Sequence, residues 1–282
     1  MITLTIEDFD LKDIFTCGQC FRWQRISDYD WIGIASAKVL RVTQEGKQVY
    51  FDCTQEEYNG FWHAYFDLGR DYGQVKNQLL ERAPDLAEAI EYGSGIRLLN
   101  QDPFEMLMTF IISANNHIPR ITDLVKRLSI EFGEPVSHPY EGLIGKLYAF
   151  PSAEVLAGVS VETYRALGLG YRDKYIKESA MRVVSEAELF RGLRQLDYKQ
   201  AKQVLTNYSG VGPKVADCIL LFSSGKYEAF PIDTWIKKTL IRRYGLSEHQ
   251  PKSIQNFIET TFGDLKGFAN QYLFYFERSK QV

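Results

Sequence analysis

The sequence predicts an α+β protein, with an antiparallel β domain at residues 1–95 and a helical domain at residues 96–282. The first segment alternates apolar and polar residues over short runs, as half-buried strands do. From Gly93-Ser94-Gly95 onward the apolar residues recur at helical spacing instead. With 282 residues and 45% hydrophobic side chains, the chain has the length of two modest domains or one large one.

Three runs of the first segment are predicted strands, at residues 21–26, 38–43 and 49–51. Glu45-Gly46-Lys47 has the composition of a turn between the second and third runs. This pattern favours an antiparallel sheet with one buried face. From about Tyr72 the period changes to that of a helix, which Pro84 interrupts.

The second segment begins with a well-marked helix start. Asp102 is placed as the N-cap, Pro103 at the first helical position and Glu105 at the third. The run from Met106 to Ile112 is hydrophobic nearly all round, which predicts a central, buried helix. Further helices are expected near residues 119–132, 152–167, 173–185, 197–207, 213–222, 234–244, 251–261 and 265–278.

The net charge of -3 is unevenly distributed. Residues 1–95 carry 9 Lys and Arg against 16 Asp and Glu, a net charge of -7, and the remainder carries +4. Binding to nucleic acid depends on the charge of the contacting surface more than on the net charge of the chain. This uneven distribution is therefore compatible with nucleic acid that contacts only residues 96–282. No apolar run approaches membrane-spanning length and the N-terminus lacks a signal-peptide pattern, so we expect neither a membrane protein nor a secreted one.

The cysteines do not predict a metal centre. Cys17-Gly18-Gln19-Cys20 has the spacing of half a zinc site or of a redox pair, but the chain has no second pair of this kind and its four His are scattered. We therefore expect reduced thiols and no bound metal.

The segment around residues 197–222 predicts two helices joined by a hairpin. Asp197 with Gln200 forms a capping box for the first helix, residues 210–212 make a tight reversal, and Pro213 starts the second helix. Such a hairpin leaves backbone N–H groups pointing outward at a helix N-terminus, which suits a phosphate and does not depend on base sequence. A plain helix–turn–helix packing corner is the alternative.

Two ionisable residues near this hairpin are candidates for chemistry. Lys214 and Cys218, four residues apart, share one face of the second helix. A lysine amine is a nucleophile that forms Schiff bases with carbonyl carbons. Asp233, nineteen residues after Lys214, is placed as the N-cap of the next helix. Helix capping and a solvated lysine explain either residue alone, although capping and catalysis are compatible.

These segments resemble the helix–hairpin–helix Gly/Pro–Asp DNA glycosylases, and among them the 8-oxoguanine DNA glycosylase/lyases. The resemblance spans most of the chain and is carried by the segments Gly18–Trp23, Arg97–Pro103, Ser113–Ile121, Leu167–Arg172, Gly210–Cys218 and Pro231–Asp233. It implies a TATA-binding-protein-like β domain packed on an all-α domain. The helix–hairpin–helix lies near residues 197–222 and the catalytic Asp loop near residues 230–233.

The resemblance implies the catalytic pair. Lys214 matches the nucleophile that attacks the sugar C1′ and forms a Schiff base, and Asp233 matches the carboxylate that stabilises the cationic sugar. A carboxylate in a desolvated site strongly stabilises a positive charge that develops beside it. A protonated imine acidifies the C2′ hydrogen, so strand cleavage by β-elimination follows from a lysine nucleophile.

The resemblance also implies how a base flipped out of the duplex is held. Cys218 and Phe274 sandwich the base, Gly18 reads it through its backbone carbonyl, and Asn270 lies at the base edge. Guanine N7 is an acceptor, whereas the oxidised base carries a hydrogen there, so one carbonyl accepts from the lesion and repels guanine. Gln271 beside Asn270 leaves the register of that helix open by one position.

The resemblance also implies which residues contact the DNA outside the base pocket. Space vacated in the duplex is filled by Asn115 and Tyr171, the estranged cytosine meets Arg120 and Arg172, and phosphate lies at the hairpin glycines, Gly210 and Gly212. Core packing is the alternative for Tyr171 and Phe274, and phosphate neutralisation is the alternative for the two arginines. The chain departs from the familiar family pattern at His117 and at Thr234-Trp235.

We therefore expect an enzyme that removes 8-oxoguanine, preferably opposite cytosine, from damaged double-stranded DNA and then cleaves the abasic site. A glycosylase for another damaged purine and a non-catalytic DNA-structure-binding module are the alternatives. The chemistry requires no cofactor, although the hairpin can take a structural monovalent cation. We expect a monomer without membrane contact, cytoplasmic and nucleoid-associated in a prokaryotic cell.

Overall fold

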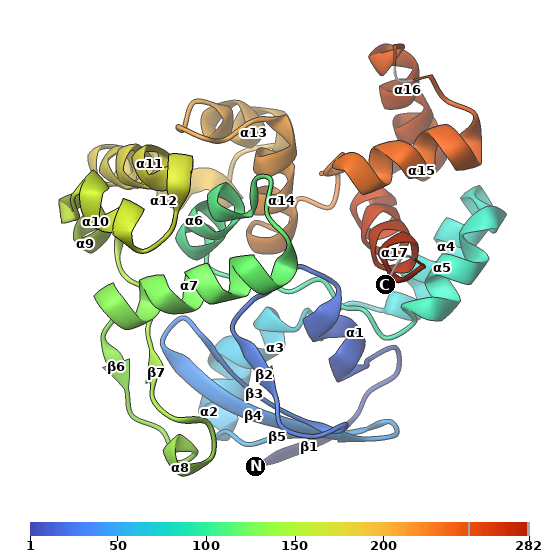
Figure 1. The fold of residues 1–282 in the computed structure, drawn as a ribbon. Helices are drawn as coiled ribbons and strands as arrows, with labels where there is room; N and C mark the ends of the chain where they lie inside the picture. The colour runs from blue at the N-terminus through green and yellow to red at the C-terminus, as the bar shows by residue number, and fades with distance from the viewer. Residues whose placement is uncertain (248, 281–282) are drawn as a thin grey trace.

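The computed structural model describes residues 1–247 and 249–280. Five antiparallel strands form one sheet in the order β1-β5-β4-β3-β2 (Figure 1). Their bounds are β1 (Ile2–Thr5), β2 (Trp23–Arg25), β3 (Asp30–Ala35), β4 (Lys38–Glu45) and β5 (Gln48–Phe51). The three predicted strands and the turn between β4 and β5 are confirmed, and β1 and β3 were missed. Every residue of β3 is buried, so its sequence lacks the alternation that marks a half-exposed strand.

The helices account for most of the remaining chain. They are α1 (Leu11–Thr16), α2 (Gln55–Glu57), α3 (His63–Tyr65), α4 (Tyr72–Arg82), α5 (Ala87–Tyr92), α6 (Pro103–Ser113), α7 (Ile118–Phe132), α8 (Glu141–Ile144), α9 (Ala153–Gly158), α10 (Val161–Ala166), α11 (Asp173–Ser185), α12 (Ala187–Arg191), α13 (Tyr198–Thr206), α14 (Pro213–Ser223), α15 (Thr234–Tyr244), α16 (Pro251–Phe262) and α17 (Lys266–Ser279). A π-helical turn spans Tyr58–Trp62, and the short strands β6 (Pro135–Val136) and β7 (Leu147–Tyr148) pair with each other.

The caps explain where the predicted helices begin. Asp102 accepts a hydrogen bond of 2.8 Å from the Glu105 backbone N–H, as the sequence predicts for α6. The single helix predicted over residues 152–167 is wrong, because the structure has α9 and α10 there. Ser160 interrupts it by capping α10, and its hydroxyl accepts from the Thr163 backbone N–H at 3.2 Å.

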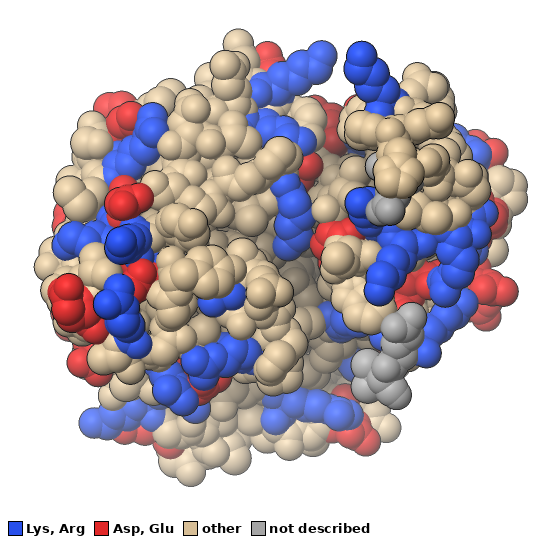
Figure 2. Space-filling view, turned by 45° about the horizontal axis from the view of Figure 1, so that its top comes forward, with Lys and Arg blue, Asp and Glu red and all other residues tan. Residues whose placement is uncertain are grey.

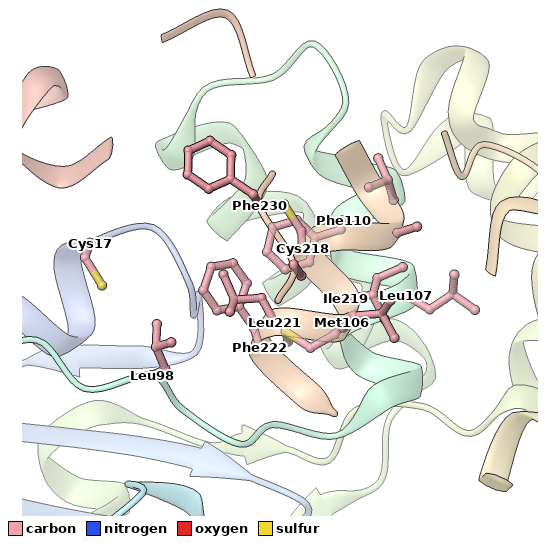
Figure 3. Packing of buried hydrophobic residues seen from close by; sticks show 14 of the residues in the cluster. Cys17, Leu98, Met106, Leu107, Phe110, Cys218, Ile219, Leu221, Phe222 and Phe230 are labelled. Atoms are coloured by element: carbon pink, nitrogen blue, oxygen red, sulfur yellow. The ribbon is translucent and has the colours of Figure 1, made fainter. Parts of the chain in front are cut away.

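Helices α6 and α14 form the centre of the larger hydrophobic core, as the apolar run of α6 predicts. The rings of Phe110 and Phe222 stack across their interface with centroids 5.6 Å apart, and Cys218 lies in the same cluster (Figure 3). A second core lies between the sheet and the π-helical turn around Phe51, Trp62 and Phe66. The position of the first residues of α14 is therefore set by buried packing along its length.

Helices α4 and α5 lie beside α17 rather than on the sheet (Figure 1). The Tyr72 ring meets the Phe268 ring edge-on at 5.7 Å, and the rings of Tyr92 and Tyr275 lie 5.0 Å apart. Chain from before residue 95 thus supports the last helix. The domain boundary near residue 95 stays a prediction.

The connection from α14 to α15 crosses between two groups of helices, one containing α6, α13 and α14 and the other containing α15, α16 and α17 (Figure 1). Figure 2 shows a hollow between two lobes on this side of the molecule, with Lys and Arg side chains on both sides of it. No helix in the part of the chain that the structure describes has the length and hydropathy needed to cross a bilayer.

Candidate active site

The hairpin between α13 and α14 has the geometry that the sequence predicts. Asp197 and Gln200 form the capping box of α13. Gly210 adopts a φ of +79°, and a Cβ there would lie 2.9 Å from the Tyr175 side chain, so the turn requires glycine. Gly212 is the N-cap of α14, is exposed and supplies no side-chain cap. The first backbone N–H groups of α14 are thus available to an anion.

Lys214 lies in the first turn of α14, one residue after Pro213, and is half-buried. Its Nζ lies 5.5 Å from the centre of the Phe110 ring. Burial raises the pKa of the Cys218 thiol to about 11, and the charge and hydrogen bond of Lys214 oppose that rise. Lys214 and Cys218 therefore share one face of α14 in the structure, as their spacing predicts.

Asp233 caps α15 and is half-buried beside Lys214. Its Oδ1 accepts a hydrogen bond of 2.8 Å from the Ile236 backbone N–H, which confirms the predicted N-cap. Burial raises the pKa of the Asp233 carboxyl, whereas the Ile236 N–H and the charge of Lys214 lower it. The capping bond fixes one oxygen of a carboxylate that also feels the lysine charge.

A pocket lies between the first residues of α14, the loop that precedes α15, the turn after α1 and helix α17. It is lined by Gly18, Phe110, Lys214, Cys218, Phe222, Pro231, Asp233, Asn270, Gln271 and Phe274. An outer cleft shares several of these residues and adds side chains that include His117, Trp235 and Arg278. Six residues predicted for catalysis and base binding thus meet in one place.

Gly18 lies tightly packed in this pocket. Its φ is +86°, and a Cβ there would come within 3.0 Å of both the Phe274 ring and Arg278 Nη1. Any larger residue would therefore be strained and would push into the pocket wall. The guanidinium carbon of Arg278 lies 5.3 Å from the centre of the Phe274 ring, so the arginine supports that ring.

The two neighbouring amides of α17 both line the pocket but bind different segments. Asn270 donates from Nδ2 to the Pro231 carbonyl at 3.0 Å, which ties α17 to the loop that contains Asp233. Gln271 donates from Nε2 to the Cys17 carbonyl at 2.9 Å, which ties α17 to the turn before Gly18. The role of Asn270 at a base edge stays a prediction.

The residues predicted to contact the DNA duplex form a second group at the loop between α6 and α7. Asn115 is exposed and has a φ of +53°, and Tyr171 is 55% exposed. Arg172 is only 7% exposed and donates to the carbonyls of Ala114 and Asn115. Its guanidinium therefore supports the Asn115 loop in this structure, and its contact with cytosine stays a prediction.

Arg120 is half-buried in the first turn of α7, and its guanidinium contacts two other residues. It donates from Nη2 to the Gly168 carbonyl at 3.0 Å, and its Nη1 lies 3.3 Å from the Asp123 carboxylate. His117, which departs from the family pattern, is the N-cap of α7 and accepts from the Arg120 backbone N–H. A capping role accounts for His117 without a contact to DNA.

The four cysteines are buried and form no disulfide. Among the residues that the structure describes, no three His, Cys, Asp or Glu side chains gather as a metal ion would require. Phe110 and Arg278 were missed as pocket residues. Phe110 lies within a nearly all-apolar run, and Arg278 is far from Gly18 in sequence, so no local pattern marks either one.

An uncapped hairpin helix that presents a lysine, with an aspartate across a pocket, defines the helix–hairpin–helix class of DNA repair glycosylases. The model of the HhH-GPD superfamily of base excision DNA repair proteins matches residues 108–262. The model of the 8-oxoguanine DNA glycosylase N-terminal domain matches residues 1–107. The chain therefore belongs to the 8-oxoguanine DNA glycosylase family.

Individual proteins agree with this assignment. The crystal structure of Clostridium acetobutylicum 8-oxoguanine glycosylase/lyase, in complex with double-stranded DNA containing cytosine opposite 8-oxoG, is 41% identical. That match covers 98% of this chain and 94% of the other, with a TM-score of 0.92. A probable N-glycosylase/DNA lyase of Methanothermobacter thermautotrophicus is 31% identical to this chain. The match covers 84% of this chain and 79% of the length of that protein. The N-glycosylase/DNA lyase OGG1 of Arabidopsis thaliana is 28% identical over 99% of this chain and 80% of its own.

Proposed function

We propose that this protein excises 8-oxoguanine from duplex DNA, preferably opposite cytosine, and cleaves the abasic site by β-elimination through a Schiff base on Lys214. The observation that supports this most directly is the meeting of Lys214, Asp233 and Gly18 at one pocket. Family membership supplies the reaction class, and the pocket supplies a nucleophile, a carboxylate and a backbone acceptor for it.

The lesion base enters the pocket after it leaves the duplex. The Gly18 carbonyl accepts from the N7 hydrogen of 8-oxoguanine, whereas the N7 acceptor of guanine is repelled by the same oxygen. Phe274 and Cys218 sandwich the base. Because burial raises the pKa of Cys218 to about 11, its thiol is uncharged at neutral pH and suits contact with a neutral ring.

Base excision breaks the bond between C1′ and N9, and the bonding electrons leave with the base. Positive charge develops on the sugar, and the nearby Asp233 carboxylate stabilises it in a partly desolvated site. The Lys214 amine forms the new bond to C1′. The raised pKa of Asp233 brings its proton exchange closer to neutral pH, which suits a group that also moves protons.

Strand cleavage follows from the same covalent bond. The C1′–O4′ bond then breaks and O4′ takes a proton from the nitrogen, which leaves a protonated imine between C1′ and Lys214 Nζ. This imine draws electrons from the C2′–H bond. Loss of the C2′ proton expels the phosphate on C3′, which is β-elimination. These steps use only groups of the protein and the DNA, so no cofactor is required.

The remaining predicted contacts hold the DNA around the pocket. The hairpin at Gly210 and Gly212 binds a phosphate through backbone N–H groups and can hold a monovalent cation through its carbonyls. Asn115 and Tyr171 enter the space that the flipped base leaves, and Arg120 meets the cytosine. One copy of the chain supplies every wall of the pocket, so we propose that a monomer acts.

Borohydride trapping on single-lesion duplexes tests the proposal, because the hydride reduces the imine to a stable covalent complex. The panel contains 8-oxoguanine, an alkylated purine, undamaged guanine and a preformed abasic site. We expect trapping with 8-oxoguanine and the abasic site. Preferential trapping with the alkylated purine would assign a different substrate, and DNA binding without trapping would leave a non-catalytic binding module.

A further inference from the structure

The turn that contains Gly18 is held by donors from distant parts of the chain. On one face of α17, Gln271 donates to the Cys17 carbonyl at 2.9 Å and Arg278 donates to the Thr16 carbonyl. The Tyr275 hydroxyl, on the same face, lies 3.1 Å from the Thr16 hydroxyl. Helix α17 therefore binds both residues that precede Gly18.

The residue after Gly18 is held just as firmly. The Gln19 carbonyl accepts from Gln101 Nε2 at 2.8 Å. The Gln19 side chain is fully buried and donates to the Arg97 carbonyl at 2.8 Å, while its Oε1 accepts from the Leu99 backbone N–H at 2.9 Å. Rotation of the peptide group after Gln19 would break the bond from Gln101, and displacement of the Gln19 Cα would break the two buried bonds of its side chain.

Gly18 is the exception within this run of carbonyls. Thr16, Cys17 and Gln19 each have a carbonyl that accepts from a long side chain. No donor among the described residues reaches the Gly18 carbonyl. Gly18 itself lines the pocket, with Phe274 and Arg278 against its Cα. The one carbonyl without a donor thus belongs to the residue at the pocket wall.

We infer that Gln271 and Arg278 are positioning residues that fix the Gly18 carbonyl and thereby set the discrimination between 8-oxoguanine and guanine. This inference rests on the proposed function, in which that carbonyl accepts from the lesion. A carbonyl that could swing aside would escape the repulsion by guanine N7 and would also lose its bond to the lesion. A carbonyl held in place delivers both the attraction and the repulsion, because no reorganisation relieves either one.

The test compares two substrates that share the lyase chemistry but differ in base reading. Gln271→Met removes the donor and keeps an unbranched side chain of similar length. We measure single-turnover cleavage of a duplex with 8-oxoguanine and of a duplex with a preformed abasic site, both opposite cytosine. We expect the loss on the lesion to exceed the loss on the abasic site by about tenfold, the effect of one lost hydrogen bond. We also expect the rate ratio of 8-oxoguanine to guanine to fall.

Equal losses on the two substrates would show a merely structural role and would overturn the inference, as would an unchanged ratio of 8-oxoguanine to guanine. Gln255→Met, at an exposed position of α16, is the matched control. Should Gln271→Met fail to fold, Arg278→Met takes its place, and the same two quantities are measured: the loss on the lesion relative to the loss on the abasic site, and the rate ratio of 8-oxoguanine to guanine. Arg278→Lys restores a donor and should therefore recover part of the discrimination between 8-oxoguanine and guanine. A wild-type protein that does not excise 8-oxoguanine would instead refute the proposed function.

Discussion

The Nζ of Lys214 lies 5.5 Å from the centre of the Phe110 ring, across the interface between α14 and α6. Phe110 is 3% exposed and belongs to the large core, so the candidate nucleophile is located by one of the best-packed parts of the molecule. An ammonium near an aromatic face gains about 0.5–2 kcal/mol. The lysine is thus positioned by the packing of α14 against α6 and by the Phe110 ring.

Lys214→Gln is expected to abolish the borohydride-trapped complex, because glutamine cannot form an imine. Binding of lesion DNA should change by no more than about threefold, since the hairpin backbone and the pocket walls remain. Trapping and a binding titration on the same duplex check this expectation. Lys252→Gln, at an exposed position on α16, is the control. Continued trapping by Lys214→Gln would place the nucleophile elsewhere.

Asp233→Asn separates capping from catalysis. Asparagine caps a helix about as well as aspartate, so the melting temperature should stay within about 2 °C of the wild type. Excision should fall by about 10²–10³, the effect of losing one electrostatic group at a transition state. Single-turnover excision and thermal melting are measured on the same preparation. If melting temperature and activity fell together, capping alone would explain the loss.

The acid limb of excision should lie above the ordinary aspartate pKa of 3.8, because burial raises the pKa of Asp233. The ionised carboxylate is the active form, so the rate falls as the pH drops through that raised value. Single-turnover excision from pH 4 to 8 measures the limb, with circular dichroism in the same buffers to show that the protein stays folded. A rate that stays flat down to pH 4 would contradict the assignment.

The two arginines that are predicted to meet the cytosine can be tested separately. Arg120→Met should slow excision opposite cytosine by about tenfold and excision opposite adenine by less, because a well-read base pair contributes about 1–3 kcal/mol. Arg172→Met should show the same cytosine-selective loss if Arg172 meets the base, whereas equal losses on both duplexes would show that its guanidinium only supports the carbonyls of Ala114 and Asn115. Duplexes that differ only in the opposite base check both variants. Equal rates for all four opposite bases in the wild type would refute base contact by Arg120.

Asp13 makes the stability of the fold depend on pH. Burial, followed by the charge of Asp10, raises its pKa from 3.8 to about 6. The folded chain therefore holds this proton more tightly than the unfolded chain, and stability is lost as the pH rises from about 4 to about 6. From pH 4 to pH 7 the free energy of unfolding of the wild type should fall because Asp13 loses its proton, whereas Asp13→Asn has no such proton to lose. The stability of Asp13→Asn relative to the wild type should therefore rise by about 1 kcal/mol over this range, after allowance for solvent screening. Curves of unfolding free energy against pH that run parallel for Asp13→Asn and the wild type would contradict this account.

Local sequence signals predicted most of the fold. Caps such as Asp102 and Asp197 were found because capping is a local interaction that leaves a fixed spacing. Strand β3 was missed because both of its faces are buried, and α1 was missed because six residues are too few to show a period. Residues 152–167 form two helices instead of one because the Ser160 side chain caps α10, and a single side-chain hydrogen bond of this kind leaves no periodic signal.

The candidate site was predictable where chemistry and chain geometry coincide. Lys214 and Asp233 follow from the hairpin and cap patterns, Gly18 follows from the family resemblance, and the structure brings all three to one pocket. Arg278 and the actual partners of Asn270 and Gln271 were not predictable. Their contacts depend on how helices far apart in the sequence pack, and one sequence carries no record of that packing.

The attachment of α17 to the turn before Gly18 has a kinetic consequence. The hydrogen bond from Gln271 to Cys17 joins residues 254 positions apart, whereas Lys214 and Asp233 are separated by a short, locally folded stretch of chain. Closing a long loop costs more entropy than closing a short one, and contacts between distant residues form late. We therefore expect the amine and the carboxylate to come together before the wall that reads the base is complete. During refolding, reactivity towards abasic sites should accordingly appear before the ability to tell damaged from undamaged guanine.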